Sequence, residues 1–343
     1  MIKQRYSGVI RSIIFLSIVV FTFITISYIF RPLSYARTSA MGLSVSEPID
    51  AVFIGSSVMR MSYAPMAAFE QEGIVTYSFT WDALTAESIK YAVKEVYKSQ
   101  EPKLLVIDLK PFEYRDLKGA NIEAEIRNFS DAIPYSVNRL EYILEVVPDN
   151  VAEEENKNPL NYIFDISKYH TRWTMLGGDA IRSWNNSVRS INKGFGYSTN
   201  VSTTDGYIDN SNVTNKVAQS DYIQEIFAEL IDYLDTLDCE VLFLVTTYSE
   251  PVKHREHYNF YAEIIEEAGY DYINMNDHQD SVNIDFDNDF YDGVHLNLQG
   301  ALKYTSYLAK YIKDEYNLLD RSEDSTYSKW HEDYREWYDS LDL

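Results

Sequence analysis

Short apolar runs recur along the chain and alternate with longer segments whose apolar residues have helical spacing. Each run is too short for a buried helix and is bounded by polar or turn residues, which indicates a buried strand. The predicted strands are 51–54, 75–79, 104–107, 241–245 and the less apolar 270–273. The helical patterns lie at 84–98, 218–236, 255–268 and 298–315. This alternation predicts a flavodoxin-like, three-layer α/β/α fold with a central parallel sheet covered on both faces.

Residues 13–30 form a continuous apolar run without a charge. Its length is close to the roughly 20 residues that a helix needs to cross the hydrocarbon core of a membrane. Three basic residues precede the run and two follow it: Lys3, Arg5 and Arg11, then Arg31 and Arg37. This bias favours a cytoplasmic N-terminus at 1–12, a single transmembrane anchor at 13–30, and an extracytoplasmic remainder attached to the cell membrane.

Two other interpretations of this run are less favoured. A cleaved signal peptide usually has a shorter apolar region that ends at a small-x-small site, whereas Arg31 and Pro32 follow this run directly. A buried core helix of a soluble domain usually has a polar face, and none interrupts this run.

The rest of the chain divides into a stalk, a large domain and a terminal helix. Residues 31–50 are mixed and polar and predict a juxtamembrane stalk. The α/β domain is expected at 51–319, with an insertion at about 112–216 that interrupts the alternation and has one helical pattern near 136–147. We expect this insertion over the carboxyl ends of the strands. An acidic, aromatic C-terminal helix is predicted at 320–343, from the spacing of Trp330, Tyr334, Trp337 and Leu341.

Composition narrows the function classes. The formal net charge is −23, which repels nucleic acid, so no nucleic-acid partner is expected. Cys239 is the single cysteine, so no intrachain disulfide can form. It precedes an apolar run, and we expect it to be a small buried side chain. Aromatic residues make up 15% of the chain. Their rings suit contacts with carbohydrate, although most are expected simply to pack at the partly buried surface.

The first candidate chemical group is Gly55-Ser56-Ser57, directly after the first predicted strand. A serine there is presented at the carboxyl edge of the sheet. If a helix follows, its first N–H groups point at the same place and suit an oxyanion in acyl transfer. A serine in this position is equally typical of a simple helix cap, so the motif alone does not decide between the two.

The second candidate group is Asp292 and His295, which lie three residues apart before the last helical pattern. In a turn, the carboxylate can hold one ring nitrogen of the histidine while the other accepts a proton from a nucleophile. A capping Asp beside a structural His is the alternative. The occurrence of both groups, one after the first strand and one before the last helix, favours a catalytic triad.

These residues resemble the SGNH, or GDSL-like, hydrolase superfamily over roughly 50–110 and 238–315. Proteins of this superfamily have a flavodoxin-like sheet, a nucleophilic serine after the first strand and an Asp-x-x-His block before the final helix. The resemblance implies that Ser57 is the nucleophile, His295 the general base and Asp292 its orienting partner. It is closest to the membrane-anchored bacterial group that modifies cell-surface polymers.

Two blocks depart from the family pattern. The family has a Gly after its second strand, but residues 77–81 contain none; it has an Asn after its third strand, but residues 108–111 contain none. Both normally contribute to the oxyanion hole. We expect the backbone N–H of Ser57 or the side chain of Lys110 to take their place. The alternative is a weakly active or inactive protein, because one lost donor costs on the order of a hundred- to a thousandfold in rate.

Other motifs are weaker. His170, Arg172 and Trp173 are grouped in the insertion as candidate sugar- or anion-binding residues, with a purely structural histidine as the alternative. No metal site is expected. Asp285, Asp287 and Asp289 alternate as in a calcium loop, but Phe290 and Leu296 stand where that loop needs Gly and an acid. No cofactor is expected, because glycine-rich nucleotide loops and Cys/His zinc spacings are absent.

The sequence therefore predicts an extracytoplasmic serine esterase or O-acyltransferase. Its expected substrates are acylated cell-surface glycans or small esters, and it would work through an acyl-enzyme. A separate membrane acyltransferase is a possible partner. The alternative function is a catalytically weak or inactive accessory protein that binds within a system for modifying surface polymers.

Overall fold

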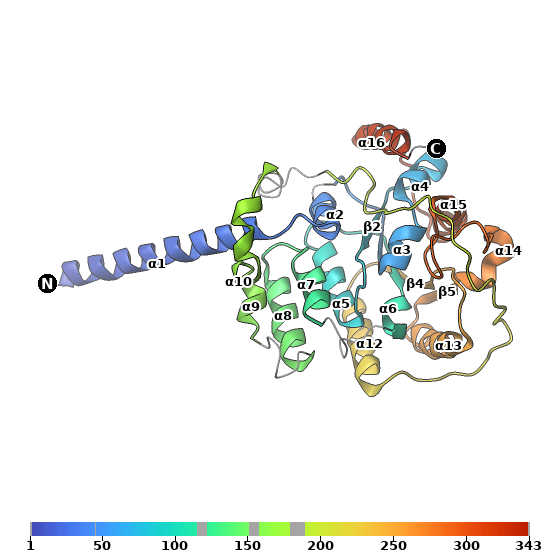
Figure 1. Ribbon diagram of the computed structural model, residues 1–343, viewed down its shortest axis with the longest axis horizontal. Helices are drawn as coiled ribbons and strands as arrows, with labels where there is room; N and C mark the ends of the chain where they lie inside the picture. The colour runs from blue at the N-terminus through green and yellow to red at the C-terminus, as the bar shows by residue number, and fades with distance from the viewer. Residues whose placement is uncertain (1, 45, 115–121, 151–157, 179–188, 342–343) are drawn as a thin grey trace.

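The architecture is a central parallel sheet flanked by helices, with a long N-terminal helix that extends away from it (Figure 1). This computed structural model describes residues 2–44, 46–114, 122–150, 158–178 and 189–341. The five strands lie in the order β2-β1-β3-β4-β5, and every pair is parallel. The predicted three-layer α/β/α fold is thus confirmed, and the order is the flavodoxin-like one.

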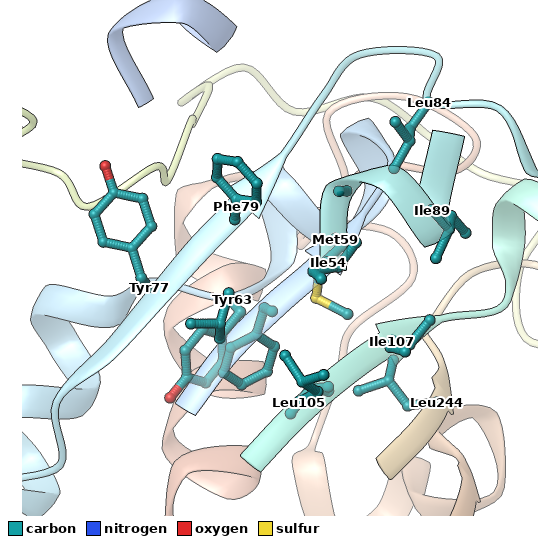
Figure 2. Close-up of a cluster of buried hydrophobic side chains, with 14 of the residues drawn as sticks. Ile54, Met59, Tyr63, Tyr77, Phe79, Leu84, Ile89, Leu105, Ile107 and Leu244 are labelled. Atoms are coloured by element: carbon teal, nitrogen blue, oxygen red, sulfur yellow. The ribbon is translucent and has the colours of Figure 1, made fainter. Parts of the chain in front are cut away.

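The strands match the apolar runs of the sequence. They are β1 (Ala51–Gly55), β2 (Thr76–Thr80), β3 (Leu104–Asp108), β4 (Glu240–Val245) and β5 (Asp271–Asn274). The three central strands are buried along nearly their whole length, which explains why their sequences are continuously apolar rather than alternating. Figure 2 shows Ile54, Leu105 and Leu244 from these neighbouring strands within the cluster of buried side chains.

Helices cover the sheet on both faces. Helix α15 (Leu298–Glu315) packs against α3 (Ser57–Ser62) and α4 (Pro65–Glu72). Helix α5 (Ala86–Val96) packs against α12 (Asp221–Leu234). Helix α13 (Val252–Glu267) packs on β5 and on the short α6 (Lys110–Tyr114). Between β5 and α15 lie η2 (Met275–His278) and α14 (Gln279–Val282). The four predicted core helices, now α5, α12, α13 and α15, are all present within a few residues of their expected bounds.

The helical part of the insertion does not lie where the sequence predicts it. This part comprises α7 (Ile122–Ser130), α8 (Val137–Asn150), α9 (Leu160–Ile163), α10 (Ile166–Tyr169) and η1 (His170–Met175). These helices stack beside α5 and reach the end of the N-terminal helix, so they do not lie over the carboxyl ends of the strands as expected (Figure 1). Residues 115–121, 151–157 and 179–188 of the predicted insertion lie outside the described residues.

Residues 31–50 do not form the predicted stalk. Helix α2 (Tyr35–Ser44) packs against β2, and most of its side chains are buried. Small residues make this possible: a Cβ added to Gly42 would lie 2.6 Å from Cβ of Ser190 and 2.7 Å from Oη of Tyr77. The polar composition of the segment suggested exposure, but its small side chains permit close packing on the edge strand instead.

The N-terminal helix α1 (Ile2–Phe30) contains one apolar stretch, Gly8–Phe30, that is long enough to cross a membrane. The stretch is 6% buried within the molecule, as expected of an anchor or a signal sequence rather than a core helix. Met1 lies outside the described residues.

A buried ionic cluster joins the end of α1 to the insertion. Arg31 lies 2.8 Å from the carboxylate of Asp165, which also lies 2.9 Å from Arg139. The Nη1 of Arg31 also donates to the backbone oxygens of Asp131 and Ile133. These side chains are buried, so each charge depends on its partners for compensation.

The predicted C-terminal helix is confirmed as α16 (Ser328–Asp339), preceded by η3 (Ser325–Tyr327). Trp330 and Trp337 are buried, and α16 packs against α4. The indole N–H of Trp330 also donates to Glu47 at 3.0 Å. The C-terminal helix therefore covers the domain and holds the residues that lead into β1.

We expect Asp165→Ala to lower the free energy of unfolding by about 3–5 kcal/mol, because it leaves two buried arginines without their shared carboxylate. Denaturant unfolding of the full chain in detergent measures the change. Asp314→Ala is the matched control: Asp314 pairs with Lys310 on the exposed side of α15, and its loss should cost less than about 1 kcal/mol. Equal effects of the two substitutions would contradict the structural role of the cluster.

Candidate active site

Ser57 stands at the point where the chain order of the sheet reverses. The chain leaves β1 toward β2 on one side and returns to β3 on the other, and ligands of such sheets bind outside the strand ends at this point. Gly55 ends β1, Ser56 is the N-cap position, and Ser57 is the first residue of α3. Its position matches the sequence prediction.

Gly55 is required by close packing. A Cβ at this position would lie 2.7 Å from Cβ of Asp108 and 2.9 Å from Cβ of Met59. The end of β3 and the first turn of α3 thus approach the end of β1 too closely for a side chain. The glycine before Ser56 and Ser57 therefore sets where the hydroxyl of Ser57 is presented.

Asp292 and His295 lie in a tight loop closed by an antiparallel bridge between Phe290 and Leu296. The N–H of Tyr291 donates to the carbonyl of His295 at 2.8 Å. Within the loop, Oδ1 of Asp292 accepts the N–H groups of Val294 and His295, each at 2.9 Å. The aspartate therefore fixes the turn as well as the histidine that follows it.

Residues at the start of α15 hold this loop in place. Asn297 caps the helix by accepting the N–H of Gly300, and its own side-chain amide donates to the carbonyl of Asn288. A Cβ at Gly300 would lie 2.3 Å from the carbonyl oxygen of Asp289, so only glycine permits this approach. Asp289 is buried and pairs with Lys303 of α15 at 2.6 Å.

The structure brings together Ser57, Asp292 and His295, the three residues of the predicted triad. Oγ of Ser57 lies 2.8 Å from Nε2 of His295, and Nδ1 of His295 lies 2.9 Å from both carboxylate oxygens of Asp292. With the proton on Nδ1 held by Asp292, Nε2 is free to accept the proton of the Ser57 hydroxyl. The side chain of His295 is 18% exposed and that of Asp292 43%. A substrate can therefore approach from solvent.

The pKa of the Asp292 carboxyl is lowered. Partial burial raises it, but hydrogen bonds from the N–H of Val294 and from the ring of His295 outweigh that effect. Asp292 is accordingly ionised across the neutral range, as a residue that orients a histidine must be.

A segment without helix or strand at 193–202 connects the two halves of the site, and the sequence analysis did not predict it. The carbonyl of Lys193 accepts the N–H of Ser78 on β2, and the N–H of Gly196 donates to the carbonyl of Arg60 on α3. Further along, the N–H of Ser202 donates to the carbonyl of Phe290 in the histidine loop. Its backbone bonds leave no periodic apolar pattern by which sequence could have revealed it.

Buried charges lie next to the site at the ends of β1, β3 and β4. Burial raises the pKa of Asp108 to about 6 and lowers that of Lys110 to about 8. The hydroxyl of Ser56 lies 3.5 Å from Asp108, and the Lys110 ammonium lies 3.5 Å from the ring centroid of Tyr248. The ammonium of Lys110 therefore faces the ring of Tyr248. The role of Lys110 in an oxyanion hole stays a prediction.

A second group of polar side chains extends this cluster, and the sequence analysis did not predict it. Glu113 lies 2.5 Å from Nδ1 of His257 and 3.2 Å from Nε2 of His254, and the hydroxyl of Tyr248 lies 2.8 Å from Nδ1 of His254. Burial and nearby Lys110 lower the pKa of His254 to about 4. The signal was available only as two histidines three residues apart, His254 just before and His257 within a predicted helix, with no indication of their distant partner.

The loop after β2 is tied to both β1 and α3. The N–H of Trp81 donates to the carbonyl of Gly55 at 3.1 Å, and Arg60 pairs with Asp82 at 2.7 Å. Ala83 then adopts a φ of 52°, a left-handed conformation that favours glycine. The loop after β2 thus contains a non-glycine residue in a glycine-like conformation.

The predicted sugar-binding group is far from Ser57. His170, Arg172 and Trp173 lie in η1, which contacts α1 on the side of the molecule away from α3 (Figure 1). Nη1 of Arg172 donates to the carbonyl of Phe30 at 2.5 Å, and Nδ1 of His170 lies 3.2 Å from the carbonyl of Ser167. These residues therefore do not line the site around Ser57, because the insertion carries them to the N-terminal helix, and their binding of a sugar or an anion stays a prediction.

A cleft of about 890 Å³ lies between the loop after β2, α7 and the residues that follow α1. Charged side chains line much of it, among them Asp82, Glu123, Arg127 and Lys168. Ser57, Asp292 and His295 are not among its lining residues. Its size alone therefore does not make it the site of the chemistry.

In the described part of the chain, no group of three or more His, Cys, Asp and Glu side chains is arranged to hold a metal ion. Comparison of the chain with models of known protein families and with curated proteins gives no match.

We expect Gly55→Ala to destabilise the fold by about 1–3 kcal/mol, because the added methyl overlaps Asp108 and Met59. Gly293→Ala is the matched control: Gly293 lies in the loop between Asp292 and His295, and a Cβ there meets nothing within 4 Å. Thermal unfolding of both variants in detergent compares them. A neutral Gly55→Ala would show that the strand end relaxes around the methyl group.

Asp108 predicts a pH dependence of stability. Because its folded-state pKa of about 6 exceeds the usual 3.8, the folded chain keeps this proton longer than the unfolded chain. Stability is therefore lost as the pH rises through that interval. We expect the stability of Asp108→Asn relative to wild type to increase by about 2 kcal/mol between about pH 4.5 and about pH 7. Denaturant unfolding at the two pH values measures this difference, and a constant difference would refute the raised pKa.

Proposed function

We propose that the chain is a serine-dependent esterase or O-acyltransferase, with Ser57 as nucleophile, His295 as general base and Asp292 as the residue that orients His295. The observation that supports it most is the continuous set of contacts from Oγ of Ser57 through the ring of His295 to the carboxylate of Asp292. A nucleophile within 2.8 Å of a base that a third group orients is the pattern of activated serines.

The reaction proceeds in two acyl transfers. Oγ of Ser57 attacks the ester carbonyl carbon while Nε2 of His295 takes the hydroxyl proton. The tetrahedral intermediate collapses when His295 returns that proton to the departing alcohol oxygen, which leaves the acyl group on Ser57. Water or a sugar hydroxyl then attacks the acyl-enzyme, its proton passes to His295, and Ser57 is restored. Water gives hydrolysis, and a sugar hydroxyl gives transfer.

The backbone N–H of Ser57 is the first candidate donor to the oxyanion. It lies in the first turn of α3, where N–H groups have no partner within the helix. Lys110 is the second candidate, with its ammonium directed over Tyr248. The loop after β2 is held against β1 and α3 by the contacts of Trp81 and Asp82, next to the stretch 77–81 that lacks the glycine of the superfamily.

The proposed substrates are acylated glycans or small esters at the outer face of the cell membrane, with α1 as the anchor. The apolar stretch Gly8–Phe30 and the resemblance to membrane-anchored SGNH-like proteins support this placement. A membrane acyltransferase is the proposed partner for transfer, since it would supply or receive the acyl group.

An accessory protein without catalysis is the second candidate. What favours it is the lack of the superfamily glycine at 77–81 and asparagine at 108–111, together with the engagement of Lys110 by Tyr248. In that case the fold would bind an acylated polymer without cleaving it.

We expect the full chain in detergent to react with a fluorophosphonate probe and to hydrolyse a short-chain aryl acetate. Ser57→Ala should abolish the labelling, because the probe bonds to the activated hydroxyl. Ser56→Ala is the matched control, since the hydroxyl of Ser56 lies near Asp108 rather than His295. Labelling that survives Ser57→Ala would reject this nucleophile, and a wild type without labelling or hydrolysis would favour the accessory protein.

We expect Asp292→Asn to lower kcat for the aryl acetate by on the order of a thousandfold or more, because the amide no longer favours the ring form that accepts a proton at Nε2. Steady-state kinetics of the full chain measures the loss. Asp287→Asn, in the exposed turn before the loop, should leave kcat unchanged. A small effect of Asp292→Asn would contradict the role of Asp292 as the residue that orients His295.

A further inference from the structure

The helical insertion packs along the last turns of α1 rather than only at its end. The ring of Phe164 contacts the ring of Phe23, with 5.2 Å between centroids, and Arg172 donates to the carbonyl of Phe30. Both α10 and η1 contact α1, and Ser27 is fully buried between these points. From Phe23 to Phe30 the helix rises about 10 Å, so the insertion packs along one side of that length of α1, and Phe23 and Ile26 remain exposed on the other side.

The uncovered part of α1 is too short to cross a membrane by itself. Arg11 and Arg31 bound the uncharged run and are about 30 Å apart along the helix axis at 1.5 Å per residue. This equals the usual thickness of the hydrocarbon core. From Arg11 to Phe23, where the insertion begins to cover the helix, the distance is only about 18 Å.

The segment that packs on α1 exposes several large apolar side chains among its polar ones. Large apolar side chains are exposed in and beside α9 and η1: Leu160 by 54%, Trp173 by 68%, Met175 by 71% and Leu176 by 40%. We call residues 160–176 the collar. Exposed apolar groups that are grouped this way in a soluble domain mark a contact surface.

We propose that the collar enters the outer leaflet of the membrane, with Trp173, Met175 and Leu176 among the lipid headgroups and the first acyl carbons. The length of α1 requires it: with the collar in water, about 12 Å of hydrocarbon core would face no apolar helix. Tryptophan is enriched at this depth because its ring is apolar and its N–H is polar. The proposed membrane contact of the collar adjoins that of α1, because the collar packs on the last turns of this helix.

Charge indicates an apolar contact rather than an electrostatic one. The net charge of −23 opposes attraction to an anionic surface. Lys168, a basic residue of the collar, pairs with Glu123, and Arg172 caps the end of α1 through Phe30. A cleft of about 150 Å³ beside Arg172, lined also by Ile29, Met175 and Leu176, provides room for part of a lipid at this junction.

Nitroxide labels on the full chain in phosphatidylcholine nanodiscs test the contact. The single cysteine, Cys239, is replaced by serine, and one new cysteine is introduced at Met175 or at Trp173. Ile18 in the middle of α1 is the lipid control, and Tyr338 on α16, exposed on the domain, is the water control. The accessibility of each label to oxygen, which enters lipid, is compared with that to a water-soluble nickel complex.

We expect the ratio of oxygen to nickel accessibility at positions 173 and 175 to exceed that at position 338 severalfold and to approach that at position 18. A water-like ratio at 173 and 175 with a lipid-like ratio at 18 would overturn the proposal, since α1 would then span without the collar. A water-like ratio at 18 would also overturn it, because α1 would not be in the membrane. Neither outcome bears on catalysis by Ser57, which the fluorophosphonate measurement tests separately.

Discussion

The hydrogen bond between Ser57 and His295 joins residues 238 positions apart in the chain, and the rest of the site is arranged around this contact. The sheet fixes one side of it. Gly55 lets the end of β3 approach β1, so α3 begins at a defined place at the switch point. Helix α15 fixes the other side through Asn297 and Gly300, which hold the histidine loop on the first turn of the helix. The contact therefore depends on two rigid supports rather than on a flexible loop.

Sequence revealed those parts of the fold that bury a regular apolar pattern. The strands and the helices α5, α12, α13 and α15 were predictable because burial on one or both faces leaves a period in the chain. The place of Ser57 and the Asp292–His295 pair followed from where those elements end. The segment at 193–202 was not predictable, because it is held by backbone hydrogen bonds to α3, β2 and the histidine loop.

The wrong predictions share a physical cause. Residues 31–50 look solvent-exposed because they are polar, yet Gly42 and other small residues let α2 pack tightly on β2. The helical insertion was expected over the carboxyl ends of the strands, yet it stacks beside α5 and carries His170 and Arg172 to α1. The burial of Asp108 and the pairing of Glu113 with His257 were missed for the same reason, since partners that come from distant segments leave no local pattern. Tertiary placement, not residue type, decides what such polar residues do.

The buried pairing of Arg31 with Asp165 and Arg139 has a mechanical consequence. A protein tethered by a flexible linker samples many heights and tilts above its membrane, and its reach grows with the length of the linker. Here the chain passes from α1 into the domain through side chains that are fully enclosed, so the domain has no such freedom. If α1 is held in a bilayer, the hydroxyl of Ser57 stays at one height and in one orientation. Under the proposed function, the distance of an ester group from the membrane surface would then decide whether it can reach Ser57.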